Sequence, residues 1–395
     1  GMAYLKAHTA TGDNYYLDAA RETAESLVYG QLKSGGWTQK IDFNPSSREA
    51  SQYRNGKGNN NGKNNSSFDD GQSQSAMLFM IRCDEALGFK HKAIHDSAMV
   101  AMKALLNAQF PNGGFPQVWT GPVKRTKVVK ASFPKYDWRT EGRIKNYWDM
   151  YTLNDGVAGY VAPVLIEARQ IYKDEKYRNA LRKLGDFLIL AQMPEPQPAW
   201  AQQYDYDMHP IWARRFEPPA IAARESEDVM QVLMTIHKET GDRKYLAPIP
   251  RALAYLKRSR LSDGRLARYY ELQNNKPLYM NRKSGTKDYF LTNSDANLPD
   301  HYGWKNTPRI KQIEAAYNDL MKNGVRPEPK RSANELEPQV KGMVGALDRS
   351  GRWITRFKGQ PLVGQPKFRA NDPFIASAVF SHNLETISEW LMATR

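Results

Sequence analysis

The segment TGDNYYLDAARETAESLVYGQLKSGGW, residues 11–37, carries the pattern that decides the fold. It predicts a turn followed by an amphipathic helix with apolar residues three and four positions apart, and it ends with Gln31 and a Gly-Gly-aromatic stop. The same plan recurs at residues 87–116, 172–200 and 240–271. Fifteen residues separate Tyr16 from Gln31, and the same number separates Tyr177 from Gln192. Recurrence of one such unit predicts an array of helical hairpins.

A second, more apolar helix is predicted in each module, and each of these helices begins near an aspartate. These aspartates are Asp69 with Asp70, Asp155, and Asp228. Helices that are apolar on most faces are buried, so each hairpin should pair a buried inner helix with an amphipathic outer helix. Because the inner helices need cover on every side, we favour a closed ring over an open solenoid. The expected fold class is all-α, an α/α toroid of repeated helical hairpins with a central cleft and few short strands.

The two ends of the chain depart from this repeat. MAYLKAHTATG, residues 2–12, is typical of the last part of an inner helix. We therefore expect a single catalytic domain over residues 1–395 that lacks the N-terminal part of its first hairpin. Beyond residue 272 a strand is predicted at PLYMNR, and helices are expected near residues 308–322, 332–347 and 373–392. The Asn-, Gly- and Ser-rich loop at residues 44–67 directly precedes Asp69, and either a lid or a spacer is compatible with it.

The charge balance points to an anionic partner. Lys and Arg number 57 against 42 Asp and Glu in 395 residues, a net charge of +15. Because these positive charges are dispersed and no nucleic-acid-binding motif is present, we expect an acidic polysaccharide as partner and no nucleic acid. No apolar run approaches the roughly 18 residues of a membrane span, so no membrane partner is expected. Cys83 is the only cysteine, which excludes an intramolecular disulfide.

We expect a monomer that is secreted or periplasmic. The start GMAYLKAHTA contains no apolar region of the kind found in signal peptides. The expectation is therefore that a signal peptide was removed ahead of Gly1.

WARRFEPP, residues 212–219, places Arg214 and Arg215 on a turn stiffened by two prolines. In a ring of hairpins the N-termini of the inner helices converge on one end, and this turn is expected at the same end. The aspartates predicted there are Asp69, Asp70 and Asp155. Any one of them alone is more typical of a helix cap than of a functional site. Grouped carboxylates suit a hard cation such as calcium, whereas arginines suit a substrate that is itself an acid.

Nine short motifs follow one another along the chain. They are SGGW (34–37), FDDGQSQ (68–74), FPNGGFPQ (110–117), LNDGV (153–157), PAWAQQYD (198–205), WARRFEPP, LARYYEL (266–272), KPLYMNR (276–282) and HYGW (301–304). As an ordered set they resemble the family 10 pectate lyases, over the stretch from about Gly12 to Trp304. The resemblance implies an α/α-toroid catalytic module. It also implies cleavage of polygalacturonate by β-elimination, with calcium as cofactor and 4,5-unsaturated products.

The resemblance also implies roles for individual residues. Asp69 and Asp155 would be the calcium-linked carboxylates, and Arg214 would be the base that removes the C5 proton. Arg268 and Arg282 would hold substrate carboxylates. An arginine base is unusual because the pKa of its guanidinium lies above about 12.

Two positions depart from the family pattern. Asp70 stands where the family more often has asparagine, which adds a negative charge at the substrate and metal site. NRKSG, residues 281–285, replaces a Gly-Arg-Asp-Gly turn. We therefore expect Lys283 to bind substrate carboxylates together with Arg282. Arg215 is expected to act as an electrostatic neighbour of Arg214 that favours loss of its proton, or as a structural contact.

Other functions remain open at this point. A glycoside hydrolase on the same α/α scaffold would use Asp69 and Asp155 as acid and base. QLKSGGW also resembles a repeat of triterpene cyclases, but the sequence has no Asp-rich acid motif and no membrane-inserting apolar stretch. A catalytically inactive protein that binds acidic glycans would keep the same arginines.

Overall fold

The computed structural model describes residues 1–56, 62–141, 144–360 and 367–395. These residues form two compact units. The smaller unit contains Gly1–Val28, Arg82–His95 and Pro327–Arg395, and the larger unit contains Tyr29–Ile81 and Asp96–Arg326. The expectation of one catalytic domain over residues 1–395 remains a prediction. Residues 57–61 of the predicted Asn-rich loop lie outside the described residues.

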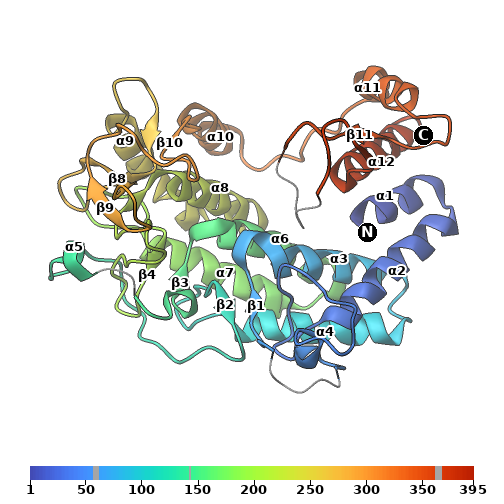
Figure 1. Ribbon diagram of the computed structural model, residues 1–395, viewed down its shortest axis with the longest axis horizontal. Helices are drawn as coiled ribbons and strands as arrows, with labels where there is room; N and C mark the ends of the chain where they lie inside the picture. The colour runs from blue at the N-terminus through green and yellow to red at the C-terminus, as the bar shows by residue number, and fades with distance from the viewer. Residues whose placement is uncertain (57–61, 142–143, 361–366) are drawn as a thin grey trace. The chain divides into compact units, whose positions relative to one another are not determined.

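Paired helices build the larger unit (Figure 1). In chain order they are α3 (Gln72–Ala86), α4 (Lys92–Asn107), α6 (Val157–Tyr172), α7 (Glu175–Leu190), α8 (Ala223–Thr240), α9 (Ile249–Arg258) and α10 (Ile310–Asn323), and α3 and α4 extend into the smaller unit. Helices α6, α7 and α8 contact one another, and α10 packs against α8 and α9. One further turn of helix, α5 (Trp138–Glu141), lies in the long connection between α4 and α6. The predicted succession of helical hairpins is confirmed.

The inner helices are buried along most of their length. Half of the α6 residues are buried, namely Val157, Ala158, Val161, Ala162, Val164, Leu165, Ala168 and Ile171. Helix α8 begins at Ala223, so Asp228 lies inside the helix and the prediction that it precedes the first turn is wrong. The first turns of α8 contain buried charged side chains, and each of these is paired. Glu225 pairs with Arg268, and Glu227 pairs with Arg309.

The glutamine that ends each outer helix joins one module to the next. Gln31 Nε2 donates to the carbonyl oxygens of Gly35 and Ser97 at 3.0 and 2.9 Å. Gln109 Nε2 donates in the same way to Gly113 and Ala180, and Gln192 Nε2 to Pro198 and Pro248. In each case one acceptor lies in the turn that follows and the other lies in or beside the next outer helix. Buried carbonyl groups need such partners, which explains the repeated spacing seen in the sequence.

Short strands connect these helices, as predicted. The strands of the larger unit are β1 (Ser66–Ser67), β2 (Val118–Trp119), β3 (Tyr151–Thr152), β4 (Gln203–Tyr204), β5 (Ile221–Ala222), β6 (Leu266–Ala267), β7 (Tyr269–Tyr270), β8 (Pro277–Arg282), β9 (Tyr289–Thr292) and β10 (Lys305–Asn306). The longest sheet has the order β5-β7-β8-β9. Strand β8 confirms the prediction at PLYMNR, and it pairs with the antiparallel strand β9.

The smaller unit is also helical. Its elements are α1 (Met2–Thr11), most of α2 (Asn14–Gly30), α11 (Ala333–Gly345), β11 (Thr355–Arg356), β12 (Pro373–Phe374) and α12 (Ser377–Ala393). Helix α12 packs against α1 and α11. Lys6 and Arg331 both pair with Glu389, at 3.2 and 2.7 Å. The helices predicted near residues 332–347 and 373–392 are confirmed.

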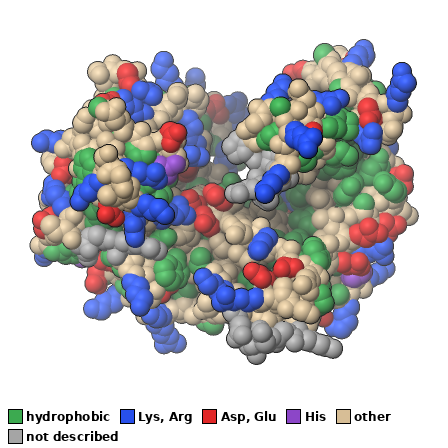
Figure 2. Space-filling model, in the orientation of Figure 1, with side chains coloured by type: hydrophobic (Ala, Val, Ile, Leu, Met, Phe, Trp, Pro, Cys, Tyr) green, Lys and Arg blue, Asp and Glu red, His purple; other side chains and the backbone are tan. Residues whose placement is uncertain are grey.

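The surface carries dispersed positive charge. Lys and Arg side chains are scattered over the face shown in Figure 2 and do not form one patch. Cys83 is a buried free thiol, and burial raises its pKa to about 12. In the described part of the chain, no helix is both long and apolar enough to cross a membrane.

Candidate active site

Two turns with the same left-handed backbone precede α3 and α6. Asp70 and Gly71 have φ angles of 47° and 74°, and Asp155 and Gly156 have 54° and 68°. Positive φ is uncommon for any residue other than glycine, but aspartate tolerates it better than most. Asp70 therefore corresponds to Asp155 in the repeat, and Asp69 corresponds to an asparagine, Asn154.

Backbone pairing fixes both turns. The N–H of Phe68 donates to the Gln117 carbonyl at 2.8 Å. In the second turn the N–H groups of Leu153 and Asn154 donate to the Gln202 carbonyl at 2.8 and 3.0 Å. The acceptors belong to the loops that follow outer helices α4 and α7. The start of each inner helix is thus held by the loop that follows the outer helix of the same hairpin.

Three carboxylates meet at these turns. Asp69, Asp70 and Asp155 each offer an oxygen, and these oxygens lie within 4.8 Å of one another. Oxygen ligands of this kind suit a hard cation such as calcium. Asp69 Oδ1 is buried and has no hydrogen-bond partner among the described residues. A buried acceptor of this kind normally has a partner, so the residues fit a bound cation.

The Asp155 carboxyl is hydrogen-bonded by side chains and does not act as a helix cap. Gln117 Nε2 donates to its Oδ2 at 2.7 Å, and Arg214 Nη2 donates to the same atom at 3.2 Å. Burial, reinforced by the neighbouring Asp69, raises the pKa of Asp155 to about 6, although Arg214 opposes the shift. Crowded, partly buried carboxylates disfavour one another's charge, and a bound cation would relieve this repulsion.

Arg214 reaches this cluster from the WARRFEPP turn. Its Nη2 lies 3.4 Å from Asp69 Oδ2 as well as 3.2 Å from Asp155 Oδ2, and its Nη1 lies 3.2 Å from Glu217 Oε1. Burial lowers the pKa of Arg214, but the Glu217, Asp155 and Asp69 carboxylates outweigh burial and the pKa is raised. The guanidinium therefore holds its proton in the arrangement described.

Glu217 was not singled out from the sequence, yet it holds Arg214 in place. Its side chain is 1% exposed, and its Oε2 accepts a hydrogen bond from the Arg214 backbone N–H at 2.9 Å. Its Oε1 also accepts from Tyr302 Oη at 3.0 Å and from Asn154 Nδ2 at 3.3 Å. A buried carboxylate needs such donors. The only sequence signal was its position in the Glu-Pro-Pro turn.

Arg268 is already paired with an acid. Its Nη2 lies 3.3 Å from Glu225 Oε1, and its side chain is 9% exposed. The guanidinium also lies 4.1 Å from the centre of the Tyr302 ring. Arg268 lines the same cavity as Asp70 and Asp155, so it lies near the carboxylate cluster with its charge compensated.

The other predicted residues lie around the β8–β9 hairpin. Arg282 Nε and Nη2 donate to Tyr289 Oη at 2.9 and 2.8 Å. Lys283 lies in the turn after β8, where its backbone N–H donates to the Asp288 carbonyl at 3.0 Å. Arg215 is exposed and lies 3.7 Å from Asp288. None of Arg215, Arg282 and Lys283 is among the described residues that line the two cavities at the carboxylate cluster.

The carboxylate cluster contributes residues to the walls of two cavities. The first, of about 700 Å³, has Asp69 and Arg214 in its wall, and the second, of about 430 Å³, has Asp70 and Asp155 in its wall. Both cavities therefore give access to the cluster.

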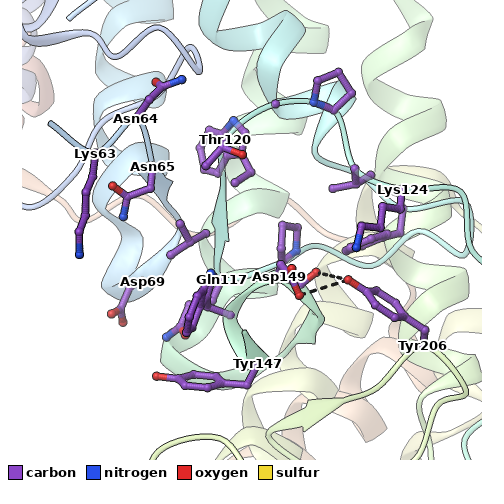
Figure 3. A pocket seen from close by; sticks show the side chains of 18 of the residues that line it. Lys63, Asn64, Asn65, Asp69, Gln117, Thr120, Lys124, Tyr147, Asp149 and Tyr206 are labelled. Carbon is purple, nitrogen blue, oxygen red and sulfur yellow. Dashed lines mark hydrogen bonds between the residues drawn. The ribbon is translucent and has the colours of Figure 1, made fainter. Parts of the chain in front are cut away.

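Figure 3 shows the first cavity from close by. Lys63 and Asn65 lie on the side of Asp69, and Lys124 lies on the opposite side near Tyr206. Tyr206 Oη donates to Asp149 Oδ1 at 3.2 Å and so fixes both side chains. Two lysines on opposite sides of a cavity favour a ligand with several negative charges.

The chain is similar to known proteins in sequence and in fold. The model of the pectic acid lyase family matches residues 31–266, more than half of the chain. Among solved structures, the chain is similar to a family 10 polysaccharide lyase from Cellvibrio cellulosa, solved as an aspartate-to-alanine mutant in complex with trigalacturonic acid. The TM-score is 0.54 at 20% identity, over 81% of this chain and 98% of that one.

The same lyase without the mutation gives a TM-score of 0.54 at 20% identity, over 78% of this chain and 95% of that one. No curated protein matches the sequence. The structural likeness confirms the all-α, α/α-toroid fold class. By the match of the family model, the chain belongs to the pectic acid lyase family, a family of polysaccharide lyases.

Proposed function

We propose that the protein is a calcium-dependent pectate lyase that cleaves polygalacturonate by β-elimination. The proposal rests on the position of Arg214, whose Nη2 lies 3.4 and 3.2 Å from carboxylate oxygens of Asp69 and Asp155. This nitrogen is at the edge of a carboxylate cluster that fits a cation and opens into two cavities. This reaction requires a proton acceptor next to a bound cation.

The chemistry explains why the two groups must be adjacent. The C5 proton of a galacturonate unit lies next to the C6 carboxylate, and its removal leaves enolate-like charge on that carboxylate. Calcium held by Asp69 and Asp155, with Asp70 as a third acid, would supply a positive charge that stabilises this charge. The C5 proton passes to the neutral form of the base and the C5–H electron pair forms the C4–C5 double bond. The C4–O4 bond breaks, and its electron pair leaves on O4, which stays on C1 of the neighbouring sugar and takes up a proton from water.

Arg214 is the proposed base. Glu217 fixes Nη1 and the backbone of Arg214, which leaves Nη2 directed at the carboxylates. The carboxylates that raise the pKa of Arg214 include the two that would bind the cation. A bound cation would neutralise part of this negative charge. The pKa of Arg214 would then fall, which makes loss of its proton easier.

Basic residues would bind the rest of the polymer. We assign Lys63 and Lys124 to the larger cavity, because both line it. Arg282, Lys283 and Arg215 remain proposed contacts for substrate carboxylates beyond the two cavities. The substrate proposed here agrees with the trigalacturonic acid bound to the related lyase mutant. A polymer of this kind lies outside the cytoplasm, so we also propose that the enzyme is secreted or periplasmic and acts as a monomer.

A product assay tests this proposal. Polygalacturonate is incubated with the enzyme in calcium and, separately, in a chelator, and ultraviolet absorbance follows the unsaturated product. We expect absorbance to rise with calcium only. A glycoside hydrolase would give saturated reducing ends without absorbance, and a glycan-binding protein without activity would give neither.

A further inference from the structure

Tyr160 lies against both of the left-handed turns. A methyl group added at Gly71 would meet the Tyr160 ring at 3.0 Å, and one added at Gly156 would meet the same ring at 3.0 Å. These distances are shorter than ordinary van der Waals contact, so only glycine lets the ring lie so close. The ring thus rests on the backbone beside both Asp70 and Asp155.

The rest of the Tyr160 side chain is open. The residue is 48% exposed. It lines the cavity that also contains Asp70, Asp155 and Arg268. Among the described residues that line this cavity, it is the only aromatic one, and most of the others are charged or polar.

We propose that Tyr160 is a stacking residue for one galacturonate ring in this second cavity, an inference that rests on the proposed function. A pyranose ring has C–H groups on its faces, and they pack favourably on the negative face of an aromatic ring. The charged walls can hold the carboxylate and hydroxyl groups of the sugar, but of the described residues in this cavity Tyr160 alone offers an aromatic surface for its C–H face.

The Tyr160 ring is held in place by the two turns against which it packs. Both turns are held by hydrogen bonds to the Gln117 and Gln202 carbonyls, so a side chain that rests on them has little freedom. A sugar stacked on Tyr160 would lie next to the Asp70 and Asp155 turns that the ring touches. Tyr160 would therefore place one sugar ring beside the proposed cation site.

The test compares Tyr160→Phe with Tyr160→Leu. Leucine still covers the two glycines but has no aromatic face, whereas phenylalanine keeps the face and loses only the hydroxyl. Both are made in an Arg214→Ala background, so that the ligand is not cleaved, and trigalacturonic acid binding is measured by calorimetry in saturating calcium. We expect Tyr160→Leu to weaken trigalacturonic acid binding about three- to tenfold relative to the Arg214→Ala parent. Tyr160→Phe should bind within about twofold of that parent. Tyr15→Ala, at a residue that is 69% exposed in α2, is the control and should bind as the parent does.

Calcium affinity and melting temperature are measured for each variant. They distinguish a role of Tyr160 in sugar stacking from a structural role in supporting the two turns. Tyr160→Leu could lower the affinity for trigalacturonic acid only in proportion to a loss of calcium affinity or of thermal stability. In that case the stacking role is wrong. It is also wrong if wild-type enzyme forms unsaturated product but Tyr160→Leu binds trigalacturonic acid as tightly as its parent. No product and no sugar binding with the wild-type protein would overturn both this inference and the proposed function.

Discussion

Asp155 Oδ2 accepts a hydrogen bond from Arg214 Nη2 at 3.2 Å, although the two residues belong to different repeats. Asp155 comes from the turn before α6, and Arg214 comes from the loop before α8. The two side chains are 15% and 31% exposed, so solvent screens their interaction only in part. This pair joins the proposed cation site to the proposed base.

Replacing Glu217 by glutamine should impair both stability and turnover. The substitution keeps the shape but removes the buried negative charge that Arg214 faces. We expect the free energy of unfolding to fall by about 1–3 kcal/mol, as for loss of a hydrogen bond to a charged group. We also expect kcat to fall more than KM rises, because the Arg214 side chain loses its fixed position. Urea unfolding and initial rates measure the two effects.

Tyr302→Phe is the matched control for Glu217→Gln. It removes one donor to Glu217 and leaves the charge pair intact. Its loss of stability should be about 1 kcal/mol. A Glu217→Gln protein with unchanged unfolding free energy and unchanged kcat would show that Glu217 has no such role.

Replacing Gly156 by alanine should destabilise the second turn for two reasons. The residue has a φ of 68°, where an L-residue loses about 1–2 kcal/mol, and the new methyl group would press on Tyr160. Gly241→Ala is the control, because its φ is 73° but a methyl group there would meet nothing within 4 Å. The difference between the two losses, measured by urea unfolding, isolates the contact with Tyr160. Equal losses would mean that the contact costs nothing.

Calcium should stabilise the folded protein through the carboxylate cluster. A ligand that binds only the folded state at 100 times its Kd adds about 2.7 kcal/mol, so the melting temperature should rise with calcium. Asp155→Asn removes one of the three carboxylates and should abolish most of this rise. Asp263→Asn, which alters an acid outside the cluster that pairs with Arg265, should leave the rise intact. A rise that survives Asp155→Asn would place the cation elsewhere.

Glu389 makes the smaller unit sensitive to acid. The Arg331 hydrogen bond, with help from Lys6, lowers the pKa of Glu389 to about 2 from an ordinary value of 4.5. A lowered folded-state pKa stabilises the protein above the unfolded value, and this stabilisation is lost as pH falls from about 4.5 towards 2. Glu389→Gln should therefore be less stable than wild type at pH 6, with a difference that shrinks below pH 4.5. A difference that does not change with pH would contradict this ion-pair account.

The helices were predictable because their signals are local and repeated. The Tyr-to-Gln spacing and the apolar inner helices reflect packing that recurs in each module, and Gln31, Gln109 and Gln192 share one hydrogen-bonding role. The start of α8 was missed because Glu225 and Glu227 resemble surface residues. Their partners Arg268 and Arg309 lie more than 40 residues away in sequence.

Only part of the candidate site was predictable from the sequence. Asp69, Asp155 and Arg214 were chosen from motifs, and the structure brings them together. Gln117 and Tyr302 were not singled out, because their roles come from contacts between segments far apart in sequence. Glu217 lies only three residues from Arg214, but a glutamate in a proline-rich turn is more often exposed than buried. The positive φ of Asp70 and Asp155 also has no sequence signal beyond the glycine that follows each of them.

The most direct test of the account is the rate at which Arg214→Ala forms unsaturated product from polygalacturonate in calcium. Loss of a general base typically costs about 10²- to 10⁴-fold in rate, so we expect a fall of that size while trigalacturonic acid still binds. Arg265→Ala should keep its rate within about threefold, because this exposed arginine pairs with Asp263 and is not among the described residues that line either cavity. A near-normal rate of unsaturated product formation by Arg214→Ala would contradict the assignment of Arg214 as the base.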